Sequence, residues 1–337
     1  MDIITNSKQI SYSLPPIFNE LLLDNTRSVL FDIETTGLNR NYDKVILIGV
    51  LYQEKENVII KQFFCENSSE ELELLKAFIA TFKDFNLYIT YNGANFDIPF
   101  LNKRFLKHNL NYQIEPYYNF DLYKAVRKNK GMLGLDNCKL KTVERFLGIN
   151  RKDTIDGRES VRLFKKYEIT KDISLKKKIL LHNYEDILHL LPTLKILNFI
   201  NKDRVFTHFP KEFSVNSELK IRILGYHINK DFLEVSGNFQ GNLPQDIILY
   251  NPNYNFRLMK KDTKFIFKIP LLNANIEGVG KYSFINLNEI NYKDYNLSEI
   301  DNEEKLKYLV KIDNEIKDIN IYNFIKDFSS YIIKSNL

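Results

Sequence analysis

Four acidic residues in three short segments constrain this chain more than any other feature of its 337 residues. Asp32 and Glu34 lie in FDIETTGL, Asp97 lies in YNGANFDIPFL, and Asp186 lies in HNYEDILHL. The first two segments each have the pattern of a strand that ends in a turn. Because α/β sheets carry their sites where strands end, we expect these acids to meet at one edge of a sheet.

Asp32 and Glu34 are two residues apart on a predicted strand, so their side chains point to the same face. Like charges that are buried together raise each other's pKa unless a cation neutralises them. An exposed edge strand with two solvated acids is the ordinary alternative for an Asp-x-Glu pair. The apolar run 29–31 directly before the pair favours the buried interpretation.

The other acids also have ordinary explanations. Asp97 can cap the helix that it opens, and His182 and Asp186, four residues apart on a predicted helix, can be a surface pair. Together, however, the four carboxylates offer an oxygen-rich site that suits two divalent cations, Mg²⁺ or Mn²⁺. Two such ions can stabilise the attacking and leaving oxygens of a displacement at phosphorus. His182 can accept a proton from the attacking water near neutral pH.

The composition narrows the class of protein. Cys65 and Cys138 lie far apart without a Cys/His cluster, which argues against a structural zinc site and a disulfide framework. The net charge of +5 is compatible with nucleic acid but does not require it. No apolar run approaches the roughly 18 residues of a membrane span, and the first residues do not have the pattern of a signal peptide. We therefore expect a soluble, cytoplasmic protein without a membrane partner.

The alternation of strand and helix patterns predicts an α/β fold over 28–200, with a mixed sheet flanked by helices. We expect strands at 28–34, 44–52, 58–64 and 87–91, and helices at 69–82, from 97, at 139–147 and at 173–199. After about residue 205 a period of two predicts a β-rich domain, either a sandwich or a small barrel. Residues 303–335 have a helical pattern. We accordingly predict two domains, 1–204 and 205–337.

The three acidic segments resemble, in order, the motifs of the DEDD superfamily of DnaQ-like 3′–5′ exonucleases, which have a ribonuclease-H-like fold. The segments FDLYKAVRKN and LDNCKLKTVERFLGINRKDTIDGRESVRLFKKY are similar to those of YprB-like proteins, bacterial members of that superfamily. The resemblance covers roughly residues 25–200. It implies that Asp32, Glu34, Asp97 and Asp186 are metal ligands.

The position of the histidine departs from the superfamily pattern. The tyrosine type has its tyrosine four residues before the last Asp, and His182 occupies that position here. The histidine type usually has a separation of five, which corresponds to Leu181. The chain thus combines the histidine chemistry with the tyrosine-type spacing. Tyr184, two residues before Asp186, is a weaker candidate than His182 for this catalytic position.

The resemblance also implies contacts with the substrate. Thr35, Thr36 and Leu38 would flank the terminal nucleotide, and Asn92 would approach the scissile bond. The residues themselves suggest phosphate contacts from basic side chains in the middle of the chain. An ordinary solvated helix face is the alternative for these side chains, which are Lys139, Lys141, Arg145, Arg151, Lys152 and Arg158.

The leading hypothesis is a metal-dependent 3′–5′ exonuclease in DNA repair, with His182 as general base. DNA that is single-stranded or has an exposed 3′ end is favoured, because YprB-like relatives are associated with DNA repair. An exoribonuclease is an alternative, since the motifs do not read the 2′-OH. A catalytically vestigial adaptor that binds nucleic acid is the second hypothesis, motivated by the shifted histidine and the large extra domain. That domain can clamp the strand, cover a sheet edge or recruit a partner such as a helicase.

Overall fold

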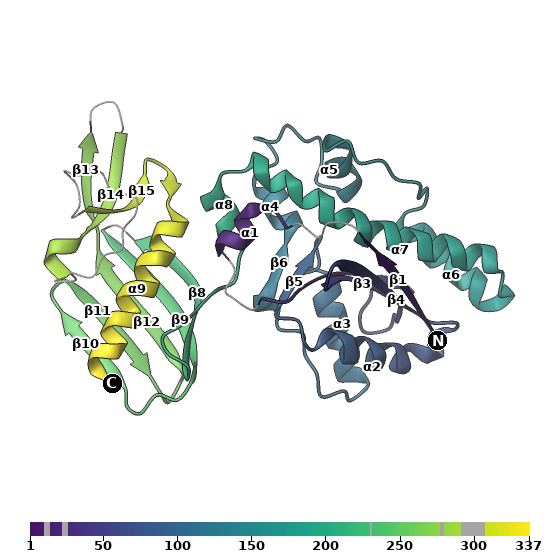
Figure 1. The fold of residues 1–337 in the computed structure, drawn as a ribbon, viewed down its shortest axis with the longest axis horizontal. Helices are drawn as coiled ribbons and strands as arrows, with labels where there is room; N and C mark the ends of the chain where they lie inside the picture. The colour runs from purple at the N-terminus through teal and green to yellow at the C-terminus, as the bar shows by residue number, and fades with distance from the viewer. Residues whose placement is uncertain (10–13, 22–25, 230, 277–279, 291–306) are drawn as a thin grey trace. The chain divides into compact units, whose positions relative to one another are not determined.

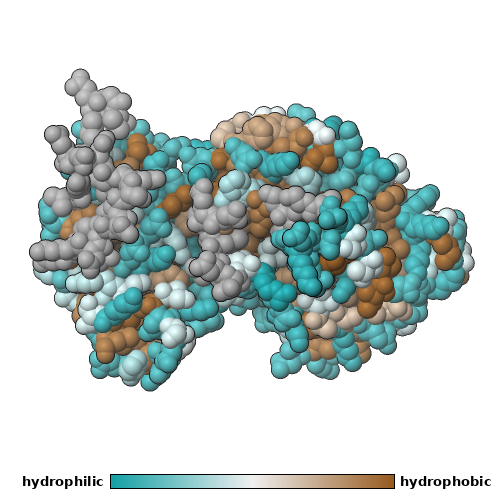
Figure 2. All heavy atoms as spheres, viewed as in Figure 1, coloured by the Kyte–Doolittle hydropathy of each residue, from teal (hydrophilic) through white to brown (hydrophobic). Residues whose placement is uncertain are grey.

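The computed structural model describes residues 1–9, 14–21, 26–229, 231–276, 280–290 and 307–337 (Figure 1). The chain divides into two compact units, Met1–Asn201 and Lys202–Leu337. No helix among the described residues combines the length and the apolar character needed to cross a bilayer. The visible surface is mostly hydrophilic, with apolar residues in small patches (Figure 2).

The first unit is built on a six-stranded mixed sheet with the order β1-β4-β3-β2-β5-β6. Its strands are β1 (Asp2–Lys8), β2 (Ser28–Thr35), β3 (Val45–Glu54), β4 (Asn57–Phe64), β5 (Leu87–Thr90) and β6 (Asn119–Asp121). The pairs from β1 to β2 are antiparallel, whereas β2, β5 and β6 run parallel. The carboxyl ends of the three parallel strands therefore meet at one edge of the sheet.

Helices cover both faces of this sheet (Figure 1). The longer ones are α2 (Glu71–Phe82), α3 (Asp97–Lys107), α6 (Gly157–Thr170) and α7 (Ile173–Thr193), and the shorter ones are α1 (Pro16–Leu21), α4 (Leu122–Lys128) and α5 (Leu140–Phe146). Short 3₁₀ helices span Ser68–Glu70, Pro116–Tyr118 and Leu194–Phe199.

The alternation of side chains along β2 separates the core from the acids. Phe31 packs edge-on against Phe82 of α2, with ring centroids 5.2 Å apart. The next residue, Asp32, faces α7 on the opposite side of the sheet, where Asn183 donates a hydrogen bond to it. One face of β2 thus stabilises the fold, and the other face carries the acidic pair.

A buried ion pair fixes the helix that begins at Asp97. The Arg104 guanidinium of α3 donates to both carboxylate oxygens of Glu71 at the start of α2, with distances of 2.8 and 2.5 Å. Glu71 also accepts a hydrogen bond from the backbone N–H of Val45 in β3. Burial raises the pKa of Glu71, but the bonds to Arg104 and its other donors outweigh burial and hold the pKa below its usual range.

The close approach of α7 to the sheet depends on a glycine. A Cβ at Gly49 in β3 would collide with the side chains of Ile187 and Asn183 in α7. Asn183 is fully buried, and its Oδ1 accepts a 2.9 Å hydrogen bond from Gln62 Nε2 of β4. These contacts set the height of α7 above the sheet.

The second unit contains two antiparallel sheets and a long terminal helix. The six-stranded sheet has the order β10-β11-β12-β9-β8-β7, and the four-stranded sheet has the order β13-β14-β15-β16. The strands are β7 (Lys211–Ser214), β8 (Leu219–Asn229), β9 (Phe232–Gly241), β10 (Ile247–Asn251), β11 (Tyr254–Met259), β12 (Lys264–Pro270), β13 (Leu272–Ile276), β14 (Gly280–Asn286), β15 (Lys307–Ile312) and β16 (Glu315–Ile316). The helices are α8 (Lys202–Phe206), the 3₁₀ helix Leu287–Ile290 and α9 (Asp318–Asn336). Residues of both sheets and of α9 share one core.

The predicted fold class is confirmed: the first unit has a mixed sheet flanked by helices, and the second is β-rich and ends in a helix. The barrel alternative is wrong for the described residues, because neither sheet closes. The expected helix at 303–335 is also wrong in part, since β15 and β16 occupy Lys307–Ile312 and Glu315–Ile316, while 303–306 lie outside the described residues. Pairing of β15 with β14 overrides the local helical pattern.

Substitution Gly49→Ala is expected to lower the melting temperature of the first unit. The added methyl group forces α7 away from β3, which costs about 1–3 kcal/mol by analogy with other overpacked cores. Thermal unfolding followed by circular dichroism measures the change, and about 2–4 °C per kcal/mol is expected for a unit of this size. Gly157→Ala is the control, because a Cβ at Gly157 meets no atom within 4 Å. Equal melting temperatures for the two variants would contradict the prediction.

Candidate active site

The four acids converge at the carboxyl end of β2. Asp32 and Glu34 lie on this strand, and Asp97 begins α3, where its Oδ1 accepts a 3.1 Å hydrogen bond from the backbone N–H of Ile33. Asp186 lies on α7, which crosses the same face of the sheet. Glu34 and Asp97 are buried, whereas Asp32 and Asp186 are partly exposed.

The close carboxylates alter one another's protonation. Burial is the largest cause of the change, raising the pKa of Glu34 and of Asp97 to about 7 and that of Asp32 well above its ordinary value. Repulsion from Asp186 raises the pKa of all three further. A cation bound between these carboxylates would offset their repulsion and stabilise their ionised form.

His182 lies within this acidic group. Its Nε2 is 3.5 Å from Glu34 Oε1 and 3.7 Å from Asp186 Oδ2, and its Nδ1 is 2.9 Å from Asp153 Oδ2. Burial lowers the pKa of His182, but attraction to Asp186 and Glu34 and the hydrogen bond to Asp153 outweigh burial and raise it. The contact with Asp153 fixes the orientation of the ring.

Asp153 and the way it is held could not be predicted from the sequence. Glu185, which is buried on α7, accepts hydrogen bonds from the backbone N–H groups of Lys152 and Asp153, at 3.0 and 2.7 Å. These bonds hold the irregular segment between α5 and α6 against α7, beside His182. Such a segment has no periodicity, so the sequence carries no signal for it.

Arg151 has an internal role, although we expected a phosphate contact. Its guanidinium donates to both oxygens of Glu144, at 2.6 and 2.7 Å, and to Asp186 Oδ1. The side chain is only 7% exposed. Arg151 therefore supplies positive charge to Asp186 and holds that carboxylate in place.

Asn183 links the acidic pair to the middle of the sheet. Its Nδ2 donates a 3.0 Å hydrogen bond to Asp32 Oδ2, while its Oδ1 accepts from Gln62. The chain Gln62–Asn183–Asp32 fixes one carboxylate oxygen of Asp32. This role could not be predicted from the sequence, because a single Asn between His182 and Asp186 matches no motif of its own.

The residues expected at the terminal nucleotide lie at the end of β2 and in the turn after it. Thr35 Oγ1 donates to the backbone carbonyl of Gly37 at 2.6 Å, and Thr36 Oγ1 donates to Asp43 at 3.2 Å. Both hydroxyls therefore stabilise the turn after the strand. Leu38 is 84% exposed, so its side chain is available to a ligand.

Three further expected contacts lie on neighbouring loops and helices. Asn92 has a φ of 69° in the turn after β5, and its backbone N–H donates to Asp121. Lys139 precedes α5, and its side chain is exposed. Lys141 Nζ instead donates to Asp153 Oδ2 at 3.1 Å and to the carbonyl of Ile155 at 2.7 Å. Lys141 thus stabilises the segment that carries Asp153.

The donor set fits a divalent cation. One ligand atom each from Glu34, His182 and Asp186 lies within 4.8 Å of the other two. Asp32 and Asp97 are close enough to repel Asp186 electrostatically, so further carboxylates border the same space. Carboxylate oxygens are preferred by Mg²⁺ and Mn²⁺.

Several known proteins are similar to the first unit in sequence. YprB of Bacillus subtilis, an uncharacterized protein, is 30% identical over 191 residues, which are 55% of this chain and 44% of YprB. The PolC-type DNA polymerase III of Ureaplasma parvum is 32% identical over 138 residues, which are 34% of this chain and 9% of the polymerase. The chain thus matches less than half the length of either relative.

A third relative has nearly the length of the first unit. An uncharacterized protein of Methanocaldococcus jannaschii is 29% identical over 179 residues, which are 50% of this chain and 93% of that protein. The family model of the RNase H superfamily matches residues 29–198, which include all four acids and His182. Because this match spans half of the chain, the protein belongs to the RNase H superfamily.

Proposed function

We propose that this protein is a metal-dependent 3′–5′ exonuclease that hydrolyses the terminal phosphodiester bond of nucleic acid. The observation that carries the proposal is the convergence of Asp32, Glu34, Asp97 and Asp186 around His182. These residues come from three distant segments of the chain, two of the four are buried, and their crowding is unfavourable unless a cation joins them.

The four carboxylates would hold two divalent cations, Mg²⁺ or Mn²⁺. When bound, the ions would supply positive charge to the attacking and leaving oxygens of the displacement. Asn183 and the backbone N–H of Ile33 orient Asp32 and Asp97 for this task. Arg151 holds Asp186.

His182 acts as general base in this proposal. Its Nδ1–H donates to Asp153, which directs Nε2 toward Glu34 and Asp186, where it would accept the proton of the attacking water. Asp153 is a positioning residue, because it contacts the imidazole on the side away from Glu34 and Asp186. In this proposal Thr35, Thr36, Leu38 and Asn92 would border the terminal nucleotide, and the exposed Lys139 would contact a phosphate close to it.

Single-stranded DNA, or DNA with an exposed 3′ end, is the favoured substrate, supported by the similarity to a DNA polymerase. We assign the activity to the first unit and an accessory role to the second. A role in DNA repair, a helicase partner and a cytoplasmic location belong to the same proposal. An exoribonuclease and a non-catalytic adaptor are the alternatives that the following experiments distinguish.

The activity itself is tested with 3′- and 5′-labelled single-stranded DNA and RNA of equal sequence, in Mg²⁺, Mn²⁺ or EDTA. We expect metal-dependent shortening from the 3′ end, faster for DNA. Asp186→Asn is expected to reduce the rate by more than about 100-fold, since it removes a group that stabilises charge at the reacting centre. Asp84→Asn, an exposed acid of the same unit, is the matched control. Binding without cleavage would instead support the adaptor.

Asp97→Asn is expected to stabilise the metal-free protein at pH 8. The folded protein holds the Asp97 proton up to a pH of about 7, above the ordinary value of 3.8, so ionisation lowers stability as pH rises through that range. In EDTA at pH 8 the variant should melt about 2–4 °C above wild type, which is the shift that about 1 kcal/mol produces in a unit of this size. At pH 4 the two melting temperatures should be nearly equal. Mn²⁺ should raise the melting temperature of wild type only. Asp84→Asn again serves as control, and a destabilised Asp97→Asn protein at pH 8 would refute this account.

Asp153→Asn tests the orientation of His182. We expect kcat to fall by about 10–100-fold, as for other groups that orient a ligand or base. The acid limb of the pH profile should move to lower pH, because Asp153 contributes to the raised pKa of His182. Asp156→Asn, on the same segment, is the control, since Asn caps a helix as well as Asp. A lower kcat with an unmoved acid limb would mean that Asp153 is only structural.

A further inference from the structure

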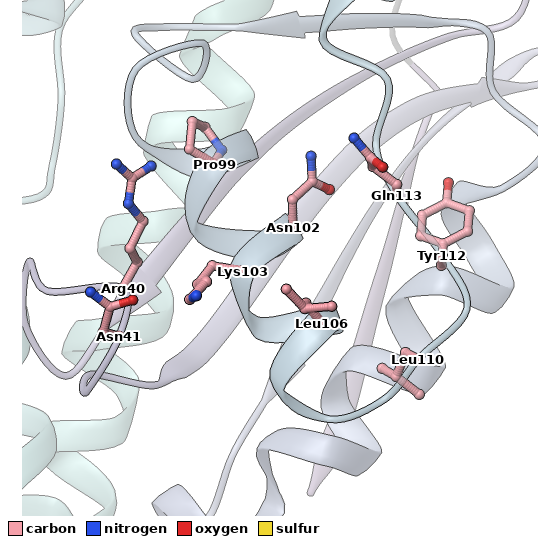
Figure 3. A pocket seen from close by; sticks show the side chains of 9 residues that line it. All are labelled: Arg40, Asn41, Pro99, Asn102, Lys103, Leu106, Leu110, Tyr112 and Gln113. Carbon is pink, nitrogen blue, oxygen red and sulfur yellow. The ribbon is translucent and has the colours of Figure 1, made fainter.

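A groove of about 590 Å³ lies along α3, and nothing in the acidic site uses it (Figure 3). The exposed face of α3 forms its floor. The loop with Arg40 and Asn41 forms one wall, and the segment with Tyr112 and Gln113 forms the other. Its volume is within the range of about 300–1,000 Å³ that is typical of ligand sites.

Hydrogen bonds hold both walls of the groove in place. Lys107 Nζ donates to the backbone carbonyl of Asn41 at 3.2 Å, which ties the first wall to α3. The amide of Asn102 donates to and accepts from the backbone of Ile114, at 2.9 and 2.8 Å, which ties the second wall to α3. The shape of the groove is therefore built into the fold.

The two sides of the groove differ in chemistry. Arg40 and Lys103 lie on one side, and neither side chain has an ion pair or hydrogen bond within the part of the chain that the structure describes (Figure 3). Tyr112 lies on the other side, with its ring edge-on to Phe105 at 5.5 Å, and Leu106 between the sides is 69% exposed. Cations beside an apolar and aromatic surface match a nucleic-acid strand, which has phosphates along one side and base faces on the other.

One end of the groove lies at the sheet edge that carries the acids, although its lining residues are on the side of α3 opposite Asp97. Arg40 lies on the loop that leaves β2 after Thr35, and the floor begins at Pro99, two residues after Asp97. From Asp97 to Leu106 the helix rises by about 14 Å at about 1.5 Å per residue.

We propose that this α3 groove binds the single strand on the 5′ side of the scissile bond. Arg40 and Lys103 contact the phosphates, and the side with Tyr112 and Leu106 faces the bases. The inference rests on the proposed exonuclease function and adds to it the path of the single strand. The groove selects single strands without reading sequence, since phosphates and base faces are common to all nucleotides.

The test is fluorescence anisotropy of a labelled dT12 oligonucleotide with the full chain in EDTA, at several salt concentrations. The double variant Arg40→Gln/Lys103→Gln should bind about tenfold more weakly than wild type. The slope of log K against log salt, which is negative, should become less steep by about 1.4, because each lost phosphate contact removes about 0.7. The control, Lys165→Gln/Lys166→Gln, removes two exposed lysines of α6 and should bind like wild type.

The outcomes separate this inference from the proposed function. If the double variant and the control both match wild type while wild type binds and shortens DNA, the groove is not the strand path and the exonuclease stands. If wild type neither binds nor shortens DNA or RNA, both proposals fall. Binding of an acidic peptide in place of dT12, lost in the double variant, would assign the groove to a protein partner and overturn the inference.

Discussion

The close approach of α7 to the sheet is the constraint on which the site depends. Gly49 leaves room for Ile187 and Asn183, so the helix can lie directly on β3. Asn183 then bridges Gln62 and Asp32, and its neighbours His182 and Asp186 are carried over Glu34. A bulkier residue at Gly49 would shift all of these groups together, because they share one rigid helix.

The same packing makes the acids unfavourable in the absence of a ligand. Burial and mutual repulsion raise the pKa values of Asp32, Glu34 and Asp97, so the metal-free site retains protons near neutral pH. Arg151 offsets part of the negative charge at Asp186. Sites that bind charge commonly give up stability in this way, and the core on the other face of β2, around Phe31, compensates for it.

Much of the first unit could be predicted from local patterns. The apolar runs before Asp32 and Asn92 are strands, and Asp97 begins a helix, as expected. The segment with Asp153 could not be predicted, because its position depends on hydrogen bonds to Glu185, which is distant in sequence. In the second unit the helical pattern around Tyr308 was misleading, since pairing with β14 decides its conformation.

The sequence alone determined the types of residue, their order and their spacing, which were enough to indicate a ribonuclease-H-like fold and four carboxylates in one site. Periodicity and turn residues are local properties, so they can be read directly from the chain. Only the tertiary structure decided that Asp153 orients His182, that Arg151 pairs with Asp186, and that Lys141 is engaged internally. These contacts join segments about 12 to 35 residues apart, and their formation depends on how the packed helices bring irregular backbone together.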